Sequence, residues 1–101
     1  MKHDRERNQR IMIEEDALLT LPKGFQEMEP QFRVWFEGVN GKVHATPKTI
    51  KAVLFYLLAL VYCKKVTMSV AGSAFSVTQD SVSRKLHEVI EVLKKEKIIN
   101  L

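Results

Sequence analysis

Cysteine, glycine and proline are scarce in this chain, which has one cysteine, four glycines and three prolines among its 101 residues. A single cysteine, Cys63, excludes an internal disulfide and any zinc site that needs several thiolates. The three histidines stand far apart, with no second ligand at metal-binding spacing. We therefore expect no metal and no cofactor. Because Cys63 closes an apolar stretch, we expect it to be a small buried hydrophobic side chain.

Signals for export, membrane insertion and catalysis are missing as well. The first ten residues, MKHDRERNQR, carry charges of both signs and no apolar h-region, so no secretory signal is predicted. The most apolar stretch, from Ile50 to Cys63, is shorter than the roughly 20 residues that cross a bilayer. No glycine-rich phosphate loop and no catalytic-triad spacing occurs. We expect an intracellular protein, cytoplasmic (in an archaeon or a virus-infected host) or nuclear, with no membrane partner, no enzymatic activity and no catalytic residue.

Acidic residues are absent from the middle of the chain. Sixteen basic and twelve acidic residues give a formal net charge of +4, and the segment from Gly38 to Gln79 holds five lysines with no aspartate or glutamate. Such a segment indicates a surface that attracts anions, and nucleic acid is the first partner to consider. A solvated lysine-rich face without a ligand is the alternative interpretation.

Helical patterns run along most of the chain, which is long enough for one domain. We predict a flexible charged arm over residues 1–9 and a single helical domain over 10–101, beginning with an amphipathic helix over 10–21. Apolar residues from Phe25 to Val39, at spacings of three and four, predict a second helix over 29–37 whose aromatic side chains belong to the core. Residues 38–45 are expected to form a loop, with a small hairpin around Asn40-Gly41 as the alternative.

The third predicted helix has the strongest start signal, with Thr46 as N-cap and Pro47 in the first turn. The stretch from Ile50 to Cys63 is apolar on nearly every side. A helix of this kind belongs at the centre of a bundle, with other helices packed around it.

Two more capped helices are predicted after the central one. Thr67 caps a short helix that ends at Phe75, and Thr78 caps a last helix with an apolar stripe at helical spacing. The residues expected to point inward from the short helix are Val70, Ala71, Ala74 and Phe75. Together with the tight turn between them and the small Gly72, where the helices approach closely, the pair is a candidate helix-turn-helix, whose second helix can lie in a DNA major groove.

Four motifs follow one another in a fixed register. They are Leu19-Thr20-Leu21-Pro22, the stretch from Thr46 to Tyr56, Lys65-Val66-Thr67, and the stretch from Ser76 to Ser83. They are similar to Leu-Asp-Leu-Pro, Ser-Pro-Lys-x-Ile-Ala-Ala-Ala-x-x-Tyr, Lys-x-Thr and Gly-Val-Thr-x-x-Thr-Ile-Arg. In this order the motifs resemble the cyclin-like repeat of transcription factor IIB and its archaeal counterparts.

The resemblance implies an all-α, five-helix cyclin-like bundle with a central apolar helix and a C-terminal helix-turn-helix. In that family, two tandem repeats behind a zinc ribbon clasp the TATA-binding protein on promoter DNA, and the fourth and fifth helices of the second repeat read the adjacent element. This chain departs from the pattern because it has one repeat and one cysteine. Ser76 replaces the turn glycine, and Asp80 and Ser83 replace the two base-reading residues of the fifth helix.

We predict a DNA-binding transcription regulator that uses its last two helices. The basic residues expected to neutralise phosphates are Lys64, Lys65, Arg84 and Lys85, and the polar residues expected to face the bases are Gln79, Ser81 and Ser83. Thr78, the predicted N-cap of the last helix, is also counted among the DNA-binding residues. The expected partners are double-stranded DNA and a TATA-binding protein or another transcription protein, with a homodimer left open. The alternatives are a protein-interaction module that docks on a transcription complex and a small helix-turn-helix repressor of the winged type.

Overall fold

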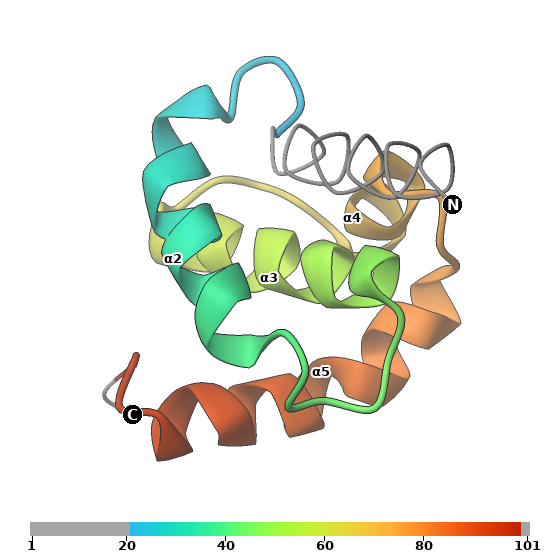
Figure 1. Cartoon of the computed structure of the whole chain (residues 1–101). Helices are drawn as coiled ribbons and strands as arrows, with labels where there is room; N and C mark the ends of the chain where they lie inside the picture. Colours follow the sequence, from blue (N-terminus) through green and yellow to red (C-terminus); the bar gives the residue numbers. More distant parts are fainter. Residues whose placement is uncertain (1–20, 100–101) are drawn as a thin grey trace, which may run out of the picture.

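The computed structural model describes residues 21–99, which form four α-helices and one short 3-10 helix (Figure 1). In chain order these are η1 (Gln26–Met28), α2 (Glu29–Val39), α3 (Pro47–Val61), α4 (Met68–Ala74) and α5 (Gln79–Lys95). Within this range there is no strand, so the segment between α2 and α3 is the predicted loop and not the alternative hairpin. The all-helical class is confirmed for residues 21–99. The predicted arm over 1–9 and the predicted helix over 10–21 lie outside the described residues, apart from Leu21, which is not helical.

Threonine caps begin three of the four α-helices, as the sequence predicts. Thr46, Thr67 and Thr78 have extended backbone, and the hydroxyl oxygen of each accepts a hydrogen bond from the backbone N–H three residues later, at 3.3, 3.1 and 3.1 Å. Each cap satisfies one of the N–H groups that the first turn of a helix leaves without a partner. The helix starts of α3, α4 and α5 therefore follow from local chemistry.

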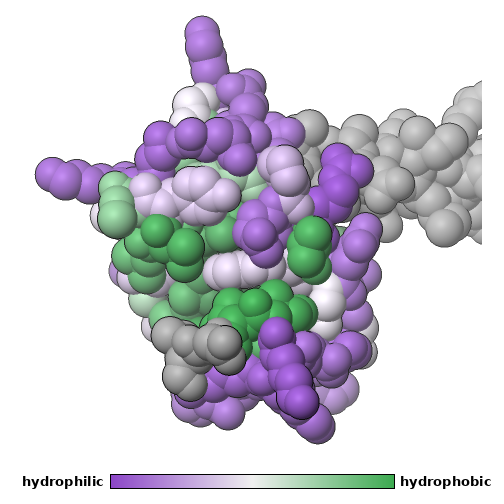
Figure 2. Space-filling view, turned by 90° about the vertical axis from the view of Figure 1, so that its left-hand side faces the viewer, coloured by the Kyte–Doolittle hydropathy of each residue, from purple (hydrophilic) through white to green (hydrophobic). Residues whose placement is uncertain are grey.

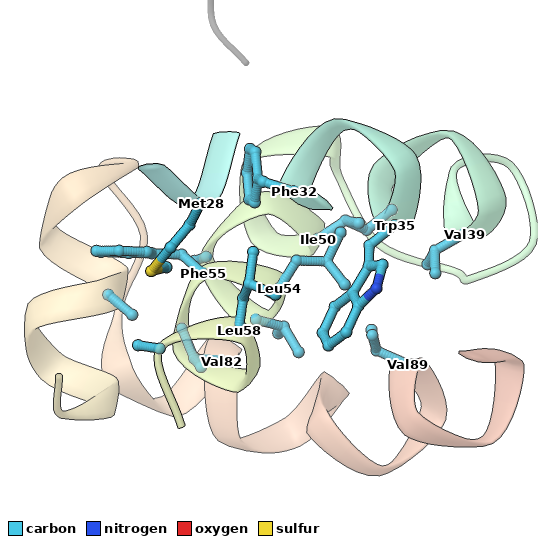
Figure 3. Close-up of a cluster of buried hydrophobic side chains, with 14 of the residues drawn as sticks. Met28, Phe32, Trp35, Val39, Ile50, Leu54, Phe55, Leu58, Val82 and Val89 are labelled. Atoms are coloured by element: carbon cyan, nitrogen blue, oxygen red, sulfur yellow. The ribbon is translucent and has the colours of Figure 1, made fainter. Parts of the chain in front are cut away.

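The helix α3 occupies the centre of the described structure and packs against α2, α4 and α5. Its buried apolar residues are Ile50, Ala52, Val53, Leu54, Phe55, Leu58 and Ala59. Figure 3 shows Met28, Phe32 and Trp35 on one side of α3 and Val82 and Val89 of α5 on the other. The prediction of a central apolar helix is confirmed over this stretch.

The aromatic stripe of residues 25–39 belongs to the core, as predicted. Phe32 is fully buried and Trp35 is 5% exposed. The rings of Phe25 and Phe55 meet edge to face, with centroids 5.0 Å apart, and Phe75 lies 6.0 Å from Phe32 and 6.1 Å from Phe55. This ring cluster joins η1 and α2 to α3 and to the end of α4, so it helps to fix where α4 stands.

The C-terminal end of α3 differs from the prediction. Leu60 and Val61 are 55% and 64% exposed, and Tyr62 is also exposed. Cys63, predicted to be buried, is exposed and has a left-handed backbone, with φ 56°. An uninterrupted apolar run in the sequence does not show how far the neighbouring helices extend along it. In the structure α3 is buried only as far as Ala59, so the residues after Ala59 are exposed.

Three of the helices end in the same way. At the ends of α3, α4 and α5 the first residue beyond the cap is left-handed, with φ 56° at Cys63, 59° at Ser76 and 58° at Lys97. In each case the next N–H bonds back across the last turn, from Lys64 to the Ala59 carbonyl, from Val77 to Gly72 and from Ile98 to Leu93, at 2.8–2.9 Å. This is the Schellman arrangement, in which glycine is the residue preferred at the left-handed position.

The orientation of α4 also corrects part of the prediction. Ala71 and Gly72 are buried and Phe75 is partly buried, but Val70 is 52% exposed and Ala74 is exposed. A helix of only seven residues buries one narrow face, and the close packing of Gly72 decides which face that is. No helix within residues 21–99 is both long enough and apolar enough to cross a membrane.

Candidate nucleic-acid interface

The unit formed by α4 and α5 has the connectivity of a helix-turn-helix. Only Phe75, Ser76, Val77 and Thr78 separate the two helices, and the left-handed Ser76 makes the chain reverse within these four residues. The two helices pack directly against each other and both pack against α3. Figure 1 shows α4 and the start of α5 together at one end of the molecule, while the C-terminus lies at the other.

Gly72 makes this tight reversal possible. A Cβ atom at Gly72 would lie 2.6 Å from the carbonyl oxygen of Val77 and 3.3 Å from the carbonyl group of Thr78. The carbonyl of Gly72 also accepts hydrogen bonds from the N–H groups of Phe75 and Val77, at 3.1 and 2.9 Å. The sequence expectation of a close approach at Gly72 is confirmed, and the approach is to the backbone that leads into α5.

Polar side chains cover the outer surface of the first turns of α5. The exposed residues there are Gln79, Asp80, Ser83, Arg84 and His87. Thr78 and Ser81 are held together by the cap, since their hydroxyl oxygens lie 2.9 Å apart. Six of the predicted residues lie at the N-cap or in the first two turns of α5, and these are Thr78, Gln79, Ser81, Ser83, Arg84 and Lys85.

Arg84 is the predicted phosphate-binding residue that stands on the exposed surface at the start of α5. Its side chain is 76% exposed and its Nε lies 2.9 Å from a carboxylate oxygen of Asp80, one turn earlier. Exposed pairs of this kind on one helix contribute only about 0.3–0.5 kcal/mol, so a phosphate group can compete with Asp80 for the guanidinium. Asp80 nevertheless removes much of the positive charge from this surface.

Lys85 lies on a different side of α5 from Ser83 and Arg84. Its side chain is 32% exposed and its Nζ is 3.4 Å from Glu88 Oε1. The other carboxylate oxygen of Glu88 accepts the backbone N–H of His44 at 2.9 Å, which ties the loop between α2 and α3 to α5. That hydrogen bond, followed by the pairing with Lys85, lowers the pKa of the Glu88 carboxyl. Lys85 is thus part of a structural contact.

The two lysines of the loop between α3 and α4 differ from each other. Lys64 Nζ lies 2.7 Å from Glu27 Oε1 and 6.0 Å from the centre of the Phe25 ring, so its ammonium group lies against η1. Lys65 is exposed and forms no ion pair within residues 21–99. Of the four predicted phosphate-binding residues, Lys65 is therefore the one whose charge is not shared with a carboxylate in this part of the chain.

An apolar groove at the other end of the molecule did not emerge from the sequence. The hollow has a volume of about 210 Å³, and its lining residues are Trp35, Leu57, Leu60, Val61, Ile90, Leu93 and Ile99. Trp35 and Leu93 form its buried floor, while Leu60 and Val61 stand exposed beside it. Figure 2 looks at this end of the molecule and shows apolar side chains gathered on the surface. The groove joins α2, α3 and α5, so only their packing reveals it.

The remaining chemistry of the described residues is sparse. Residues 21–99 contain no group of three histidine, cysteine or carboxylate side chains that could hold a metal ion. Comparisons with protein-family models, with curated proteins and with solved structures gave no match.

Proposed function

We propose that this protein is a DNA-binding transcription regulator in which α4 and α5 act as a helix-turn-helix. The observation that supports the proposal is the close contact between Gly72 and the backbone of Val77, which sets α5 against α4 while leaving the first turns of α5 exposed. In helix-turn-helix proteins the second helix enters the major groove with its N-terminal residues at the base edges.

In this proposal the chain is a single cyclin-like repeat that resembles one repeat of transcription factor IIB, and its partners are double-stranded DNA and a TATA-binding protein or another transcription protein. Gln79 and Ser83, one helical turn apart and both exposed, face the bases. Arg84 and Lys65 contact phosphates, and Lys85 reaches one by exchanging its carboxylate partner. A regulator of this kind works where the DNA is, in the cytoplasm of a cell without a nucleus or in the nucleus.

The test is the salt dependence of binding to labelled duplex DNA, measured with and without a TATA-binding protein. Each phosphate contact contributes about 0.9 to the slope of log affinity against log salt. The double variant Arg84→Ala, Lys85→Ala should weaken binding to all sequences and reduce this slope by nearly two.

The matched control is Lys94→Ala, Lys95→Ala, which removes the same charge from the opposite end of the same helix. This control should leave the slope unchanged. An equal reduction of the salt slope in both double variants would mean that α5 makes no localised contact with DNA. An unchanged slope in both would mean that DNA binds to a surface other than α5.

The second candidate function is a protein-interaction module, and the apolar groove favours it. A hollow of about 210 Å³ with Leu60 and Val61 exposed at its edge is the kind of surface that proteins use to bind one another. If duplex DNA of any sequence binds with no measurable affinity at low salt, this candidate takes the place of the first. A winged repressor has less support, because residues 21–99 contain no strand from which a wing is built.

A further inference from the structure

Most of the side-chain hydrogen-bonding groups at the start of α5 already have partners in their own chain. The Thr78 hydroxyl accepts the backbone N–H of Ser81 at 3.1 Å, and the two hydroxyl oxygens lie 2.9 Å apart. The guanidinium of Arg84 pairs with the carboxylate of Asp80 at 2.9 Å. A base edge has to compete with these partners for the same polar atoms, so none of these four side chains is ready to read a base.

Gln79 and Ser83 are the exposed polar residues of the first two turns that form no side-chain hydrogen bond or ion pair within residues 21–99. They differ in what they can recognise. A serine hydroxyl both donates and accepts through one short group, so it discriminates weakly between bases. The amide of Gln79 carries an acceptor oxygen and a donor NH₂ group side by side in one plane. In the major groove adenine shows the complementary pair, a donor at N6 and an acceptor at N7.

The backbone that carries Gln79 is held firmly against α4. Gln79 is the first residue of α5, directly after the Thr78 cap. The Val77 N–H bonds to the Gly72 carbonyl at 2.9 Å, and a Cβ atom at Gly72 would lie 2.6 Å from the Val77 carbonyl oxygen. Recognition by a pair of hydrogen bonds needs a backbone placed to within about 0.5 Å, and a rigid turn of this kind provides it. The N-terminal residues of the second helix are also those that meet base edges in helix-turn-helix proteins.

We propose that Gln79 sets the base preference of this protein by reading an adenine in the major groove. The amide oxygen of Gln79 accepts a hydrogen bond from the N6 amino group, and its NH₂ group donates one to N7. This assignment rests on the proposed function and adds a chemical feature to the DNA site, an adenine opposite the first residue of α5. Because the amide is neutral, the contact distinguishes sequences without contributing to the salt dependence of binding.

The experiment is selection from a random duplex library with the full chain, followed by dissociation constants for the selected site and for the three sites that replace its adenine. For the wild type, replacement of one invariant adenine should weaken binding by about 5- to 140-fold, which corresponds to about 1–3 kcal/mol. Gln79→Ala should lose the preference at this position and keep it at all others. Gln79→Arg should exchange adenine for guanine at the same position, because arginine pairs bidentately with guanine O6 and N7.

Gln26→Ala and Gln26→Arg are the matched controls. Gln26 is an exposed glutamine in η1, outside the α4–α5 unit, and its arginine variant adds the same charge as Gln79→Arg. Both controls should select the sites of the wild type. The salt slope gives a second readout, because Gln79→Ala removes no phosphate contact and should leave the slope unchanged. Unchanged Tm values should show that all four variants fold, since both glutamines are exposed.

Two results overturn the assignment of Gln79 and leave the proposed function standing. One is a wild type that selects duplex sites without an invariant adenine. The other is an adenine preference that Gln79→Ala and Gln79→Arg leave intact. A wild type that binds no duplex at low salt overturns the proposed function and the assignment together.

Discussion

Substitution of Gly72 by alanine tests the contact that fixes α4 against the start of α5. The added methyl group would lie 2.6 Å from the carbonyl oxygen of Val77 and 3.3 Å from the carbonyl carbon and oxygen of Thr78. All three atoms belong to the backbone, and the Val77 N–H is bonded to the Gly72 carbonyl at 2.9 Å, so the turn cannot yield as a flexible side chain would. Overpacking of this kind costs about 1–3 kcal/mol, and the better helix propensity of alanine returns about 1 kcal/mol. Because the atoms that the new methyl group would meet belong to the backbone, we expect Gly72→Ala to lower the free energy of unfolding by about 1–2 kcal/mol.

The assay is thermal unfolding followed by circular dichroism. For a domain of this size a loss of 1 kcal/mol lowers Tm by about 4–8 °C, so Gly72→Ala should lower it by about 4–16 °C. Ser73→Ala, at the exposed neighbouring position of the same helix, is the control and should change Tm by no more than a few degrees. If Gly72→Ala is as stable as the wild type or more stable, the turn has space for a Cβ atom at position 72. That result would refute the close approach between Gly72 and the backbone of Val77.

Four further substitutions test other parts of the fold. Ser76→Gly should raise the free energy of unfolding by about 0.5–1 kcal/mol, because glycine adopts the left-handed backbone at the end of α4 without strain, and a decrease would argue against that conformation. Leu54→Ala in the fully buried part of α3 should lower the free energy of unfolding by about 2–5 kcal/mol. Leu60→Ala at the exposed end of the same helix should change it by no more than about 0.5 kcal/mol. Equal effects of the two substitutions would contradict the burial pattern. Glu88 has its pKa lowered by the His44 N–H, so it stabilises the folded state above its ordinary pKa of 4.5, and this stability is lost as pH falls through the lower folded pKa. Glu88→Gln should therefore flatten the fall of Tm below about pH 4.5, and a profile parallel to that of the wild type would mean that the pKa of Glu88 is the same in the folded and unfolded states.

The parts of the fold that the sequence predicts correctly depend on near neighbours along the chain. Thr46, Thr67 and Thr78 cap their helices because a hydroxyl group and an N–H three residues later need nothing else. The aromatic stripe and the centre of α3 are buried as predicted, since helical periodicity alone identifies a core face. The close approach at Gly72 is also predicted correctly, because a residue without a side chain lets the backbone of Val77 and Thr78 come near.

The parts that escape prediction depend on residues distant in sequence. Leu60 and Val61 belong to the same apolar run as Leu58, and only the extent of the neighbouring helices decides that they are exposed. The salt bridge between Lys64 and Glu27 and the hydrogen bond from His44 to Glu88 join positions 37 and 44 residues apart, so no local pattern indicates them. Of the predicted basic residues, only Lys64 is paired by a contact of this kind, whereas Arg84 and Lys85 pair with Asp80 and Glu88 within one helical turn.

The most direct test of the central claim, that the start of α5 enters a DNA groove, is selection from a random duplex library with the wild type and the double variant Asp80→Val, Ser83→Arg. Both positions are exposed on the first two turns of α5, so the double variant should unfold within about 1 kcal/mol of the wild type. Removal of a carboxylate that repels phosphates should raise affinity, and an arginine that pairs bidentately with guanine is worth about 1–3 kcal/mol of discrimination. The account predicts that the double variant binds more tightly and shifts its preference to guanine-containing sites. Recovery of the same sites by both proteins, or of none by either, would contradict it.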